Sequence, residues 1–148
     1  MDASGLKELG ETIHNAMVDF SIRGGDWSPD LSGGCAVGSW LLQQEAKKKL
    51  DLDIEFHCNS NHAWNEFGNH IFDITATQYG AYDKVLIVPK SNLESVSNSW
   101  HRAMYTSAKR EDISQVNTTW PVGQQPANYK IEWAGRYKAR ITFKDRRK

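Results

Sequence analysis

The stretch Asn61-His-Ala-Trp-Asn-Glu-Phe-Gly-Asn-His-Ile-Phe-Asp-Ile-Thr-Ala-Thr-Gln-Tyr-Gly80 predicts a two-stranded β-hairpin. Its turn dipeptide is Gly68-Asn69, and apolar positions recur on both sides of that turn. A two-residue loop gives a definite register, with the cross-strand pairs Glu66 with Ile71, Trp64 with Asp73 and His62 with Thr75. One face of the hairpin then carries the apolar side chains Ala63, Phe67, Phe72 and Ile74.

This register places His62 and Asp73 on the same face of the predicted hairpin. They become diagonal cross-strand neighbours about 7–8 Å apart between backbones, a span that an imidazole can bridge. A three-residue loop would put the two side chains on opposite faces, so the prediction depends on the turn. A histidine held by a carboxylate is half of a nucleophilic site, and another segment must supply the nucleophile.

Cys35 is the candidate nucleophile because the sequence places it at the start of a helix. The preceding loop, from Asp26 to Gly34, is rich in turn formers, and Ser32 or Gly33 is the expected helix cap. Unpaired N–H groups and the positive end of the helix dipole would stabilise a thiolate in the first turn. Gly33-Gly34 would also remove side-chain bulk where a carbonyl carbon approaches. The sequence leaves open that Cys35 is simply a small buried helix residue.

The composition predicts one domain, residues 1–148, with a substantial hydrophobic core. Lys and Arg together number 18, as do Asp and Glu, and charged residues make up 24% of the chain, which is typical of a globular protein. Two cysteines are too few for a disulfide scaffold, so we expect reduced thiols and a cytoplasmic location. We expect no membrane association, because no apolar run approaches a membrane span and the start lacks signal-peptide order.

The remaining segments complete an α+β fold. A first helix would be capped by Ser4 and bury one apolar stripe, with His14 at the edge of that stripe or facing solvent. Cys58 is expected to be a core thiol, and the continuous apolar strand ended by Pro89 is expected to lie centrally in the sheet. The predicted antiparallel sheet comprises strands near residues 53–58, 61–67, 70–76 and 83–88 together with a C-terminal hairpin from 129 to 143, and the Cys35 helix packs against it.

Three short motifs, in order, carry a family resemblance: Gly33-Gly34-Cys35-Ala36, His62-Ala63-Trp64-Asn65-Glu66 and Asp73-Ile74-Thr75. They resemble the core of the transglutaminase-like branch of the papain-like cysteine hydrolases, which presents Cys at a helix start, His in an H-A-W-x-E strand and Asp in a D-x-T strand. The resemblance covers about residues 30–80. It implies that Cys35 is the nucleophile, His62 the general base and Asp73 the residue that orients His62.

The implied chemistry is acyl transfer or hydrolysis through a thioester, of the peptidase, amidase, glutamine deamidase or transglutaminase type, on a peptide or another amide-containing substrate. It requires no cofactor or metal. The sequence lacks the upstream Gln that papain-type peptidases use to hold the oxyanion, since position 29 is Pro29. Trp64 and Glu66 share the face of His62 and are candidates for pocket wall and rim, or else for packing and solvent contact.

Two other functions compete with this interpretation. A metal site could draw on His57, Cys58, His62 and His70, although their spacing matches no zinc module. A non-catalytic binding module could use the basic C-terminal end, because residues 128–148 hold eight Lys and Arg against two acidic residues. Its aromatic residues, Trp120, Tyr129, Trp133 and Tyr137, could stack on a nucleic acid or line a site for an acidic partner. They occur on both strand faces, however, so several must be core, and nucleic acid is not favoured.

Overall fold

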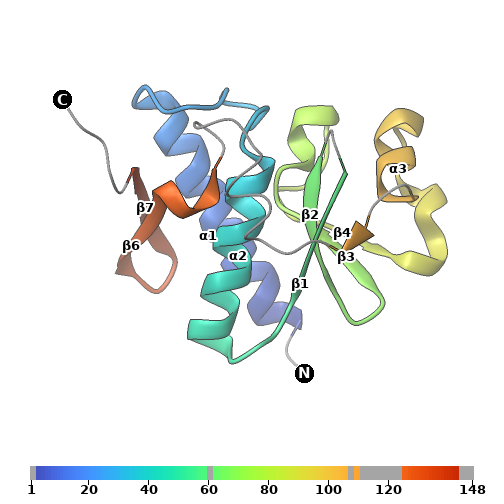
Figure 1. Cartoon of the computed structure of the whole chain (residues 1–148), viewed down its shortest axis with the longest axis horizontal. Coiled ribbons are helices and arrows are strands. Elements are labelled where there is room, and N and C mark those ends of the chain that lie inside the picture. Colours follow the sequence, from blue (N-terminus) through green and yellow to red (C-terminus); the bar gives the residue numbers. More distant parts are fainter. Residues whose placement is uncertain (1–2, 60–61, 107–108, 111–124, 144–148) are drawn as a thin grey trace.

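The computed structural model describes residues 3–59, 62–106, 109–110 and 125–143 (Figure 1). The α-helices are α1 (Ala3–Ile22), α2 (Cys35–Leu50) and α3 (Ser99–Thr106), and the 3-10 helices are η1 (Ala76–Tyr79), η2 (Lys90–Ser95) and η4 (Pro126–Asn128). The strands are β1 (Glu55–Cys58), β2 (Ala63–Phe67), β3 (His70–Asp73), β4 (Leu86–Pro89), β5 (Lys109–Arg110), β6 (Tyr129–Gly135) and β7 (Lys138–Phe143). Within these residues, no helix combines the length and apolarity needed to cross a membrane.

The central sheet has five strands in the order β4-β3-β2-β1-β5, and every neighbouring pair is antiparallel. Phe67 pairs with His70 and Glu66 pairs with Ile71 across the β2–β3 turn. These pairs confirm the two-residue loop and the register predicted from the sequence. Because side chains alternate between the faces of a strand, the register fixes the faces of all the residues that follow.

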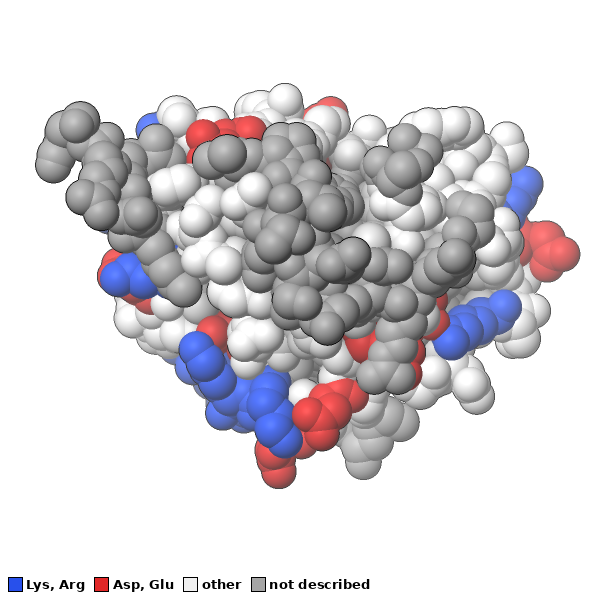
Figure 2. All heavy atoms as spheres, in the orientation of Figure 1, with Lys and Arg blue, Asp and Glu red and all other residues white. Residues whose placement is uncertain are grey.

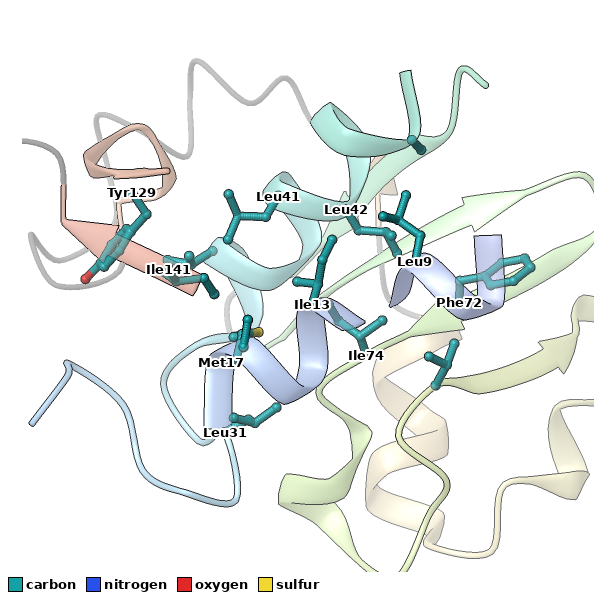
Figure 3. Packing of buried hydrophobic residues seen from close by; sticks show 14 of the residues in the cluster. Leu9, Ile13, Met17, Leu31, Leu41, Leu42, Phe72, Ile74, Tyr129 and Ile141 are labelled. Carbon is teal, nitrogen blue, oxygen red and sulfur yellow. The ribbon is translucent and has the colours of Figure 1, made fainter. Parts of the chain in front are cut away.

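The sheet lies between two layers. Phe72 and Ile74 join the apolar core that α1 and α2 build on one face (Figure 3). On the other face, Trp64 and Ile71 pack with Tyr105 of α3. The chain is therefore an α+β protein in which the helix that begins at Cys35 packs against an antiparallel sheet, with α3 on the far side (Figure 1).

A close approach of α1 and the loop before α2 positions the start of α2. A Cβ atom on Gly34 would lie 2.8 Å from Cε of Met17 and 3.1 Å from the ring of Trp27. The indole N–H of Trp27 donates to the main-chain oxygen of Met17 at 2.9 Å, which ties the loop to α1. Gly34 thus lets the core approach the backbone. The prediction that Gly33-Gly34 removes bulk where a carbonyl carbon approaches does not hold for Gly34, because its missing side chain would point at Met17 and Trp27.

Two predictions about the sheet are also wrong. The apolar strand β4 lies at an edge and not at the centre of the sheet. The C-terminal hairpin does not join the central sheet; β6 and β7 form a separate two-stranded sheet that packs on α1 and α2. Trp133 of this hairpin donates its indole N–H to the buried carboxylate of Glu45 in α2 at 2.7 Å.

One prediction about α1 needs correction as well. Ser4 lies inside α1, which begins at Ala3, so it is not the cap. Of the two positions left open for His14, facing solvent is excluded: it is 5% exposed and its Nδ1 lies 2.8 Å from the main-chain oxygen of Ile74. That bond ties α1 to the residue directly after Asp73.

Candidate catalytic site

Cys35 is the first residue of α2, as the sequence predicted. The predicted cap, Ser32 or Gly33, is wrong: Gly34 occupies the cap position and provides no side-chain hydrogen bond to the helix. The first-turn N–H groups of an α-helix have no partner within the helix, so the positive end of the α2 dipole meets the Cys35 side chain. Cys35 is buried, with 6% of its surface exposed, and is a free thiol.

His62 and Asp73, from neighbouring segments of the β2–β3 hairpin, form a buried ion pair. Nε2 of His62 donates to Oδ2 of Asp73 at 2.6 Å. His62 is fully buried and Asp73 is 1% exposed. The hairpin register accounts for this geometry, because it turns both side chains to the face of the sheet that α3 covers.

Cys35 acts on the same imidazole. Nδ1 of His62 is buried and forms no hydrogen bond with another described residue. The Cys35 side chain is close enough to raise the pKa of the imidazole. With Nε2 committed to Asp73, Nδ1 is the nitrogen left to exchange a proton with the sulfur.

Both members of the ion pair have shifted pKa values. Burial alone would lower the pKa of His62, but the charge and hydrogen bond of Asp73 outweigh burial, Cys35 adds to them, and the pKa rises from 6.5 to about 10. Burial alone would raise the pKa of Asp73. The charge of His62 overcomes it, with hydrogen bonds from neighbouring side chains, and holds that pKa well below its usual range. At neutral pH the pair is therefore imidazolium and carboxylate.

The carboxylate of Asp73 is held on both oxygens. Oδ1 accepts the main-chain N–H of Thr75 at 3.0 Å and the Thr75 hydroxyl at 3.3 Å. Oδ2 accepts the hydroxyl of Tyr105 at 2.6 Å in addition to His62. Nε2 of His101 lies 2.6 Å from the Tyr105 oxygen and 3.6 Å from Oδ2. Both α3 side chains are buried.

Sequence reasoning did not assign Tyr105 or His101 to the site. Both residues are buried, whereas Trp100 in the same helix is 60% exposed. The available signal was the spacing of His101 and Tyr105, four residues apart, which puts them on one face of a helix. Nothing in that spacing indicates that the face meets Asp73.

Aromatic rings contribute to the burial of the His62 imidazole. The ring of Tyr79, in η1, packs edge-on against His62 at 5.0 Å and stacks on His101 at 4.5 Å between centroids. Trp100 packs on the outer side of Tyr79 at 5.5 Å. Burial and the charges of Cys35 and Asp73 raise the pKa of Tyr79, so its phenol stays neutral.

Trp64 and Glu66 lie in the interior, beneath the site. Trp64 is fully buried, stacks on His62 at 5.5 Å and donates its indole N–H to Glu66 at 3.1 Å. Glu66 is 6% exposed and pairs with Lys90 at 2.6 Å. Of the two roles that the sequence left open, the structure places both side chains in packing and ion pairing and gives neither a face toward a substrate.

A tetrahedral zinc ion does not fit the distance between the His62 and Asp73 ligand atoms. His62, Asp73 and His101 bring three potential ligand atoms within 4.8 Å of one another. Ligands about 2.0–2.2 Å from a tetrahedral zinc lie roughly 3.3 Å apart, whereas the His62 and Asp73 atoms are 2.6 Å apart and share a proton. The set predicted from the sequence is divided: His57 pairs with Glu55 at 2.8 Å, Cys58 packs among buried apolar side chains, as predicted for a core thiol, His62 is bonded to Asp73, and His70 is exposed.

The C-terminal hairpin offers little stacking surface among the described residues. Tyr129 is fully buried and packs against Phe20 and Trp27, while Trp133 is bonded to Glu45. Tyr137 is 56% exposed; Trp120 lies outside the described residues. On the face shown in Figure 2, Lys and Arg side chains gather at the last turn of α2 beside acidic ones.

Comparisons of the chain with protein-family models, with curated proteins and with solved structures found no match. The functional argument therefore rests on the residues and their geometry.

Proposed function

We propose that this chain is a cysteine-dependent acyltransferase or hydrolase of the transglutaminase-like branch of the papain-like superfamily. Cys35 is the nucleophile, His62 the acid and base, and Asp73 the residue that orients His62. The observation that carries the proposal is the buried His62–Asp73 pair, whose second imidazole nitrogen is left for a thiol at the start of a helix. These three groups, in these roles, make up a thiol acylation site.

The ionised pair prepares the thiol for attack. Asp73 holds the Nε2 proton of His62, so the other ring proton sits on Nδ1, toward Cys35. An imidazolium beside the sulfur and the positive end of the α2 dipole both favour the thiolate. Asp73 accepts hydrogen bonds on both oxygens and its pKa is far below neutral, so it stays a carboxylate throughout.

Acylation proceeds by attack of the thiolate on an amide or ester carbonyl carbon. The C–S bond forms and a tetrahedral intermediate places negative charge on the former carbonyl oxygen. The intermediate collapses with cleavage of the C–N or C–O bond, and Nδ1 of His62 gives its proton to the leaving amine or alcohol. A thioester on Cys35 remains, and the imidazole is now neutral.

Deacylation reverses the proton transfers. A water molecule or an acceptor amine attacks the thioester carbonyl while Nδ1 of His62 takes its proton. The C–S bond breaks and the thiolate–imidazolium pair is restored. The main-chain N–H of Cys35, in the first turn of α2, is the donor available to the oxyanion, because no helical carbonyl can accept it.

Trapping of the acyl-enzyme tests this proposal. The folded chain is treated with a panel of activated esters and peptide amides and analysed by intact mass and peptide mapping. We expect one acyl group on Cys35, its loss in Cys35→Ala and its retention in Cys58→Ala. Acylation of neither cysteine, or equal acylation of both, would contradict the proposal. If neither cysteine is acylated, a salt-dependent complex of the chain with an oligonucleotide would favour the alternative function, a non-catalytic binding module.

A further inference from the structure

The strongest unassigned feature is the pair of α3 side chains behind Asp73. His101 and Tyr105 are four residues apart, so both project from the same face of α3. Tyr105 reaches Oδ2 of Asp73, the same oxygen that accepts His62, and both hydrogen bonds are 2.6 Å long. An element distant in sequence from the hairpin thus contacts the carboxylate on which His62 depends.

Counting protons fixes the direction of every bond in this group. An ionised carboxylate only accepts, so Tyr105 must give its single hydroxyl proton to Asp73. The Tyr105 oxygen can then only accept from Nε2 of His101, which lies 2.6 Å away, so that nitrogen carries a proton. Burial and the charge of Asp73 raise the pKa of Tyr105, which keeps the hydroxyl proton in place.

Among the described residues, the ring nitrogens of His101 form hydrogen bonds only with this group. Its Nδ1 is buried and has no hydrogen-bond partner among the described residues, whereas Nε2 serves the Tyr105 hydroxyl and lies near Asp73. A histidine that only supported the fold would be expected to satisfy both ring nitrogens, because an unpaired buried polar atom is costly. The unpaired Nδ1 therefore belongs to a histidine whose other ring nitrogen serves the group around Asp73.

We infer that Tyr105 and His101 are positioning residues that hold the Asp73 carboxylate in the orientation that His62 requires. The inference rests on the proposed function of the site. Thr75 fixes Oδ1, and the Tyr105 hydroxyl, itself fixed by His101, fixes Oδ2. With both oxygens held, the carboxylate cannot rotate away from Nε2 of His62 when the imidazole loses its charge during acylation.

Tyr105→Phe isolates the hydroxyl from the ring. Phenylalanine keeps the edge-on contact with Trp64, 4.8 Å between centroids, and the contact with His101. Tyr82→Phe is the matched control: its hydroxyl accepts the main-chain N–H of Asn98 at 3.1 Å and its ring contacts His101 at 5.2 Å, but among the described residues it is not a hydrogen-bond partner of Asp73. If the effect of Tyr105→Phe came only from losing a phenol hydroxyl near His101, Tyr82→Phe should show the same effect.

The first readout is the NMR signal of the Nε2 proton of His62, which requires no substrate. In Tyr105→Phe, Oδ2 of Asp73 loses one of its two donors and keeps His62, so we expect this proton to move downfield or to exchange with water. It should keep its position in Tyr82→Phe. An unchanged signal in Tyr105→Phe would overturn the inference, whether or not the chain proves to be an enzyme.

The second readout is the pH profile of Cys35 alkylation. The hydrogen bond from Tyr105 lowers the pKa of Asp73, so Tyr105→Phe should move the acid limb of the profile upward. Separately, a carboxylate that is no longer held on Oδ2 should orient His62 less well and slow alkylation at neutral pH roughly tenfold. If the parent shows no His62-dependent alkylation, the proposed function fails and the NMR signal alone tests the positioning. If the parent alkylates normally and Tyr105→Phe matches it, the positioning role fails.

Variants of His101 keep the test decisive if Tyr105→Phe does not fold. His101→Gln preserves an N–H donor toward Tyr105, whereas His101→Leu removes it. The inference requires the Leu variant to shift the His62 proton and slow alkylation while the Gln variant stays near the parent. Equal behaviour of the two would overturn it.

Discussion

Nε2 of His62 lies 2.6 Å from Oδ2 of Asp73, and almost no surface of either residue is exposed. Solvent screening is weak at such a site, so each charge depends on the other for its stability. Removing one partner would leave the other as an uncompensated buried charge. Variants that preserve shape while changing hydrogen bonding are therefore more informative than truncations.

Asp73→Asn separates a catalytic carboxylate from a structural one. Asparagine nearly preserves size, but it can present a donor to His62 and so stabilise the wrong tautomer, with the proton on the nitrogen facing Cys35. We expect acyl transfer to fall roughly 10²- to 10⁴-fold while the chain still folds. Turnover measured beside thermal unfolding checks this. Full activity in the variant would reduce the site to a Cys35–His62 dyad.

The His62–Asp73 pair should make stability depend on pH from both sides. The pKa of His62 is raised from 6.5 to about 10, so its contribution is complete below pH 6.5 and is lost as pH rises toward 10. The pKa of Asp73 is depressed from 3.8, so its contribution is present above that value and is lost in acid.

Denaturant titration across pH 3–10 measures this dependence, and we expect the free energy of unfolding attributable to the pair to be greatest between 3.8 and 6.5. A His62→Gln variant is the reference, because glutamine does not titrate. A parent-minus-variant difference that grows between pH 7 and 10 would contradict the assignment.

His14 should have the opposite dependence. Burial lowers its pKa, despite the hydrogen bond to Ile74 and with a further contribution from Lys84, so the folded protein holds the ring neutral. The unfolded chain then takes up a proton more readily, and the contribution of His14 to stability is lost as pH falls below 6.5. His14→Asn places a non-titrating donor where Nδ1 lies. We expect the parent to lose stability relative to this variant between pH 6.5 and 5, and parallel stability curves would refute the prediction.

Gly10 should not tolerate alanine, although alanine favours helices by about 1 kcal/mol. A Cβ atom there would lie 2.9 Å from Cγ2 of Val85 and 3.1 Å from Cγ2 of Ile74. Both neighbours are β-branched and have few alternative rotamers. We expect Gly10→Ala to lower the free energy of unfolding by about 1–2 kcal/mol. Adding Val85→Ala should recover part of the loss, so additive effects in this double-mutant cycle would contradict a steric cause.

The sequence was most informative where local chemistry sets geometry. Gly68-Asn69 predicted the turn, and the turn fixed the register that brings His62 and Asp73 to one face. Likewise the turn-rich loop before Cys35 predicted a helix start, and α2 begins at Cys35.

Long-range packing was not predictable in the same way. The apolar run of β4 indicated a central strand. Apolar side chains, however, depend on whether other elements cover the two faces of the sheet and do not show how many strands lie beside the strand. Val88, in this edge strand, is buried because Val96 and Tyr105 cover it. The contact of Tyr105 with Asp73 spans 32 residues and depends on how α3 packs, which spacing alone does not determine.

The two thiols provide the most direct test of the central claim, because exposure does not distinguish them. Cys35 is 6% and Cys58 is 8% exposed, so access alone would give equal iodoacetamide labelling or slightly favour Cys58. The second-order rate constants at pH 7, measured by peptide mapping of the native chain and of His62→Ala, decide the matter. We predict that Cys35 reacts faster than Cys58 and that His62→Ala slows Cys35 alone. Equal rates for the two cysteines, or a Cys35 rate unchanged in His62→Ala, would contradict the claim that the buried imidazolium activates a nucleophile at the start of α2.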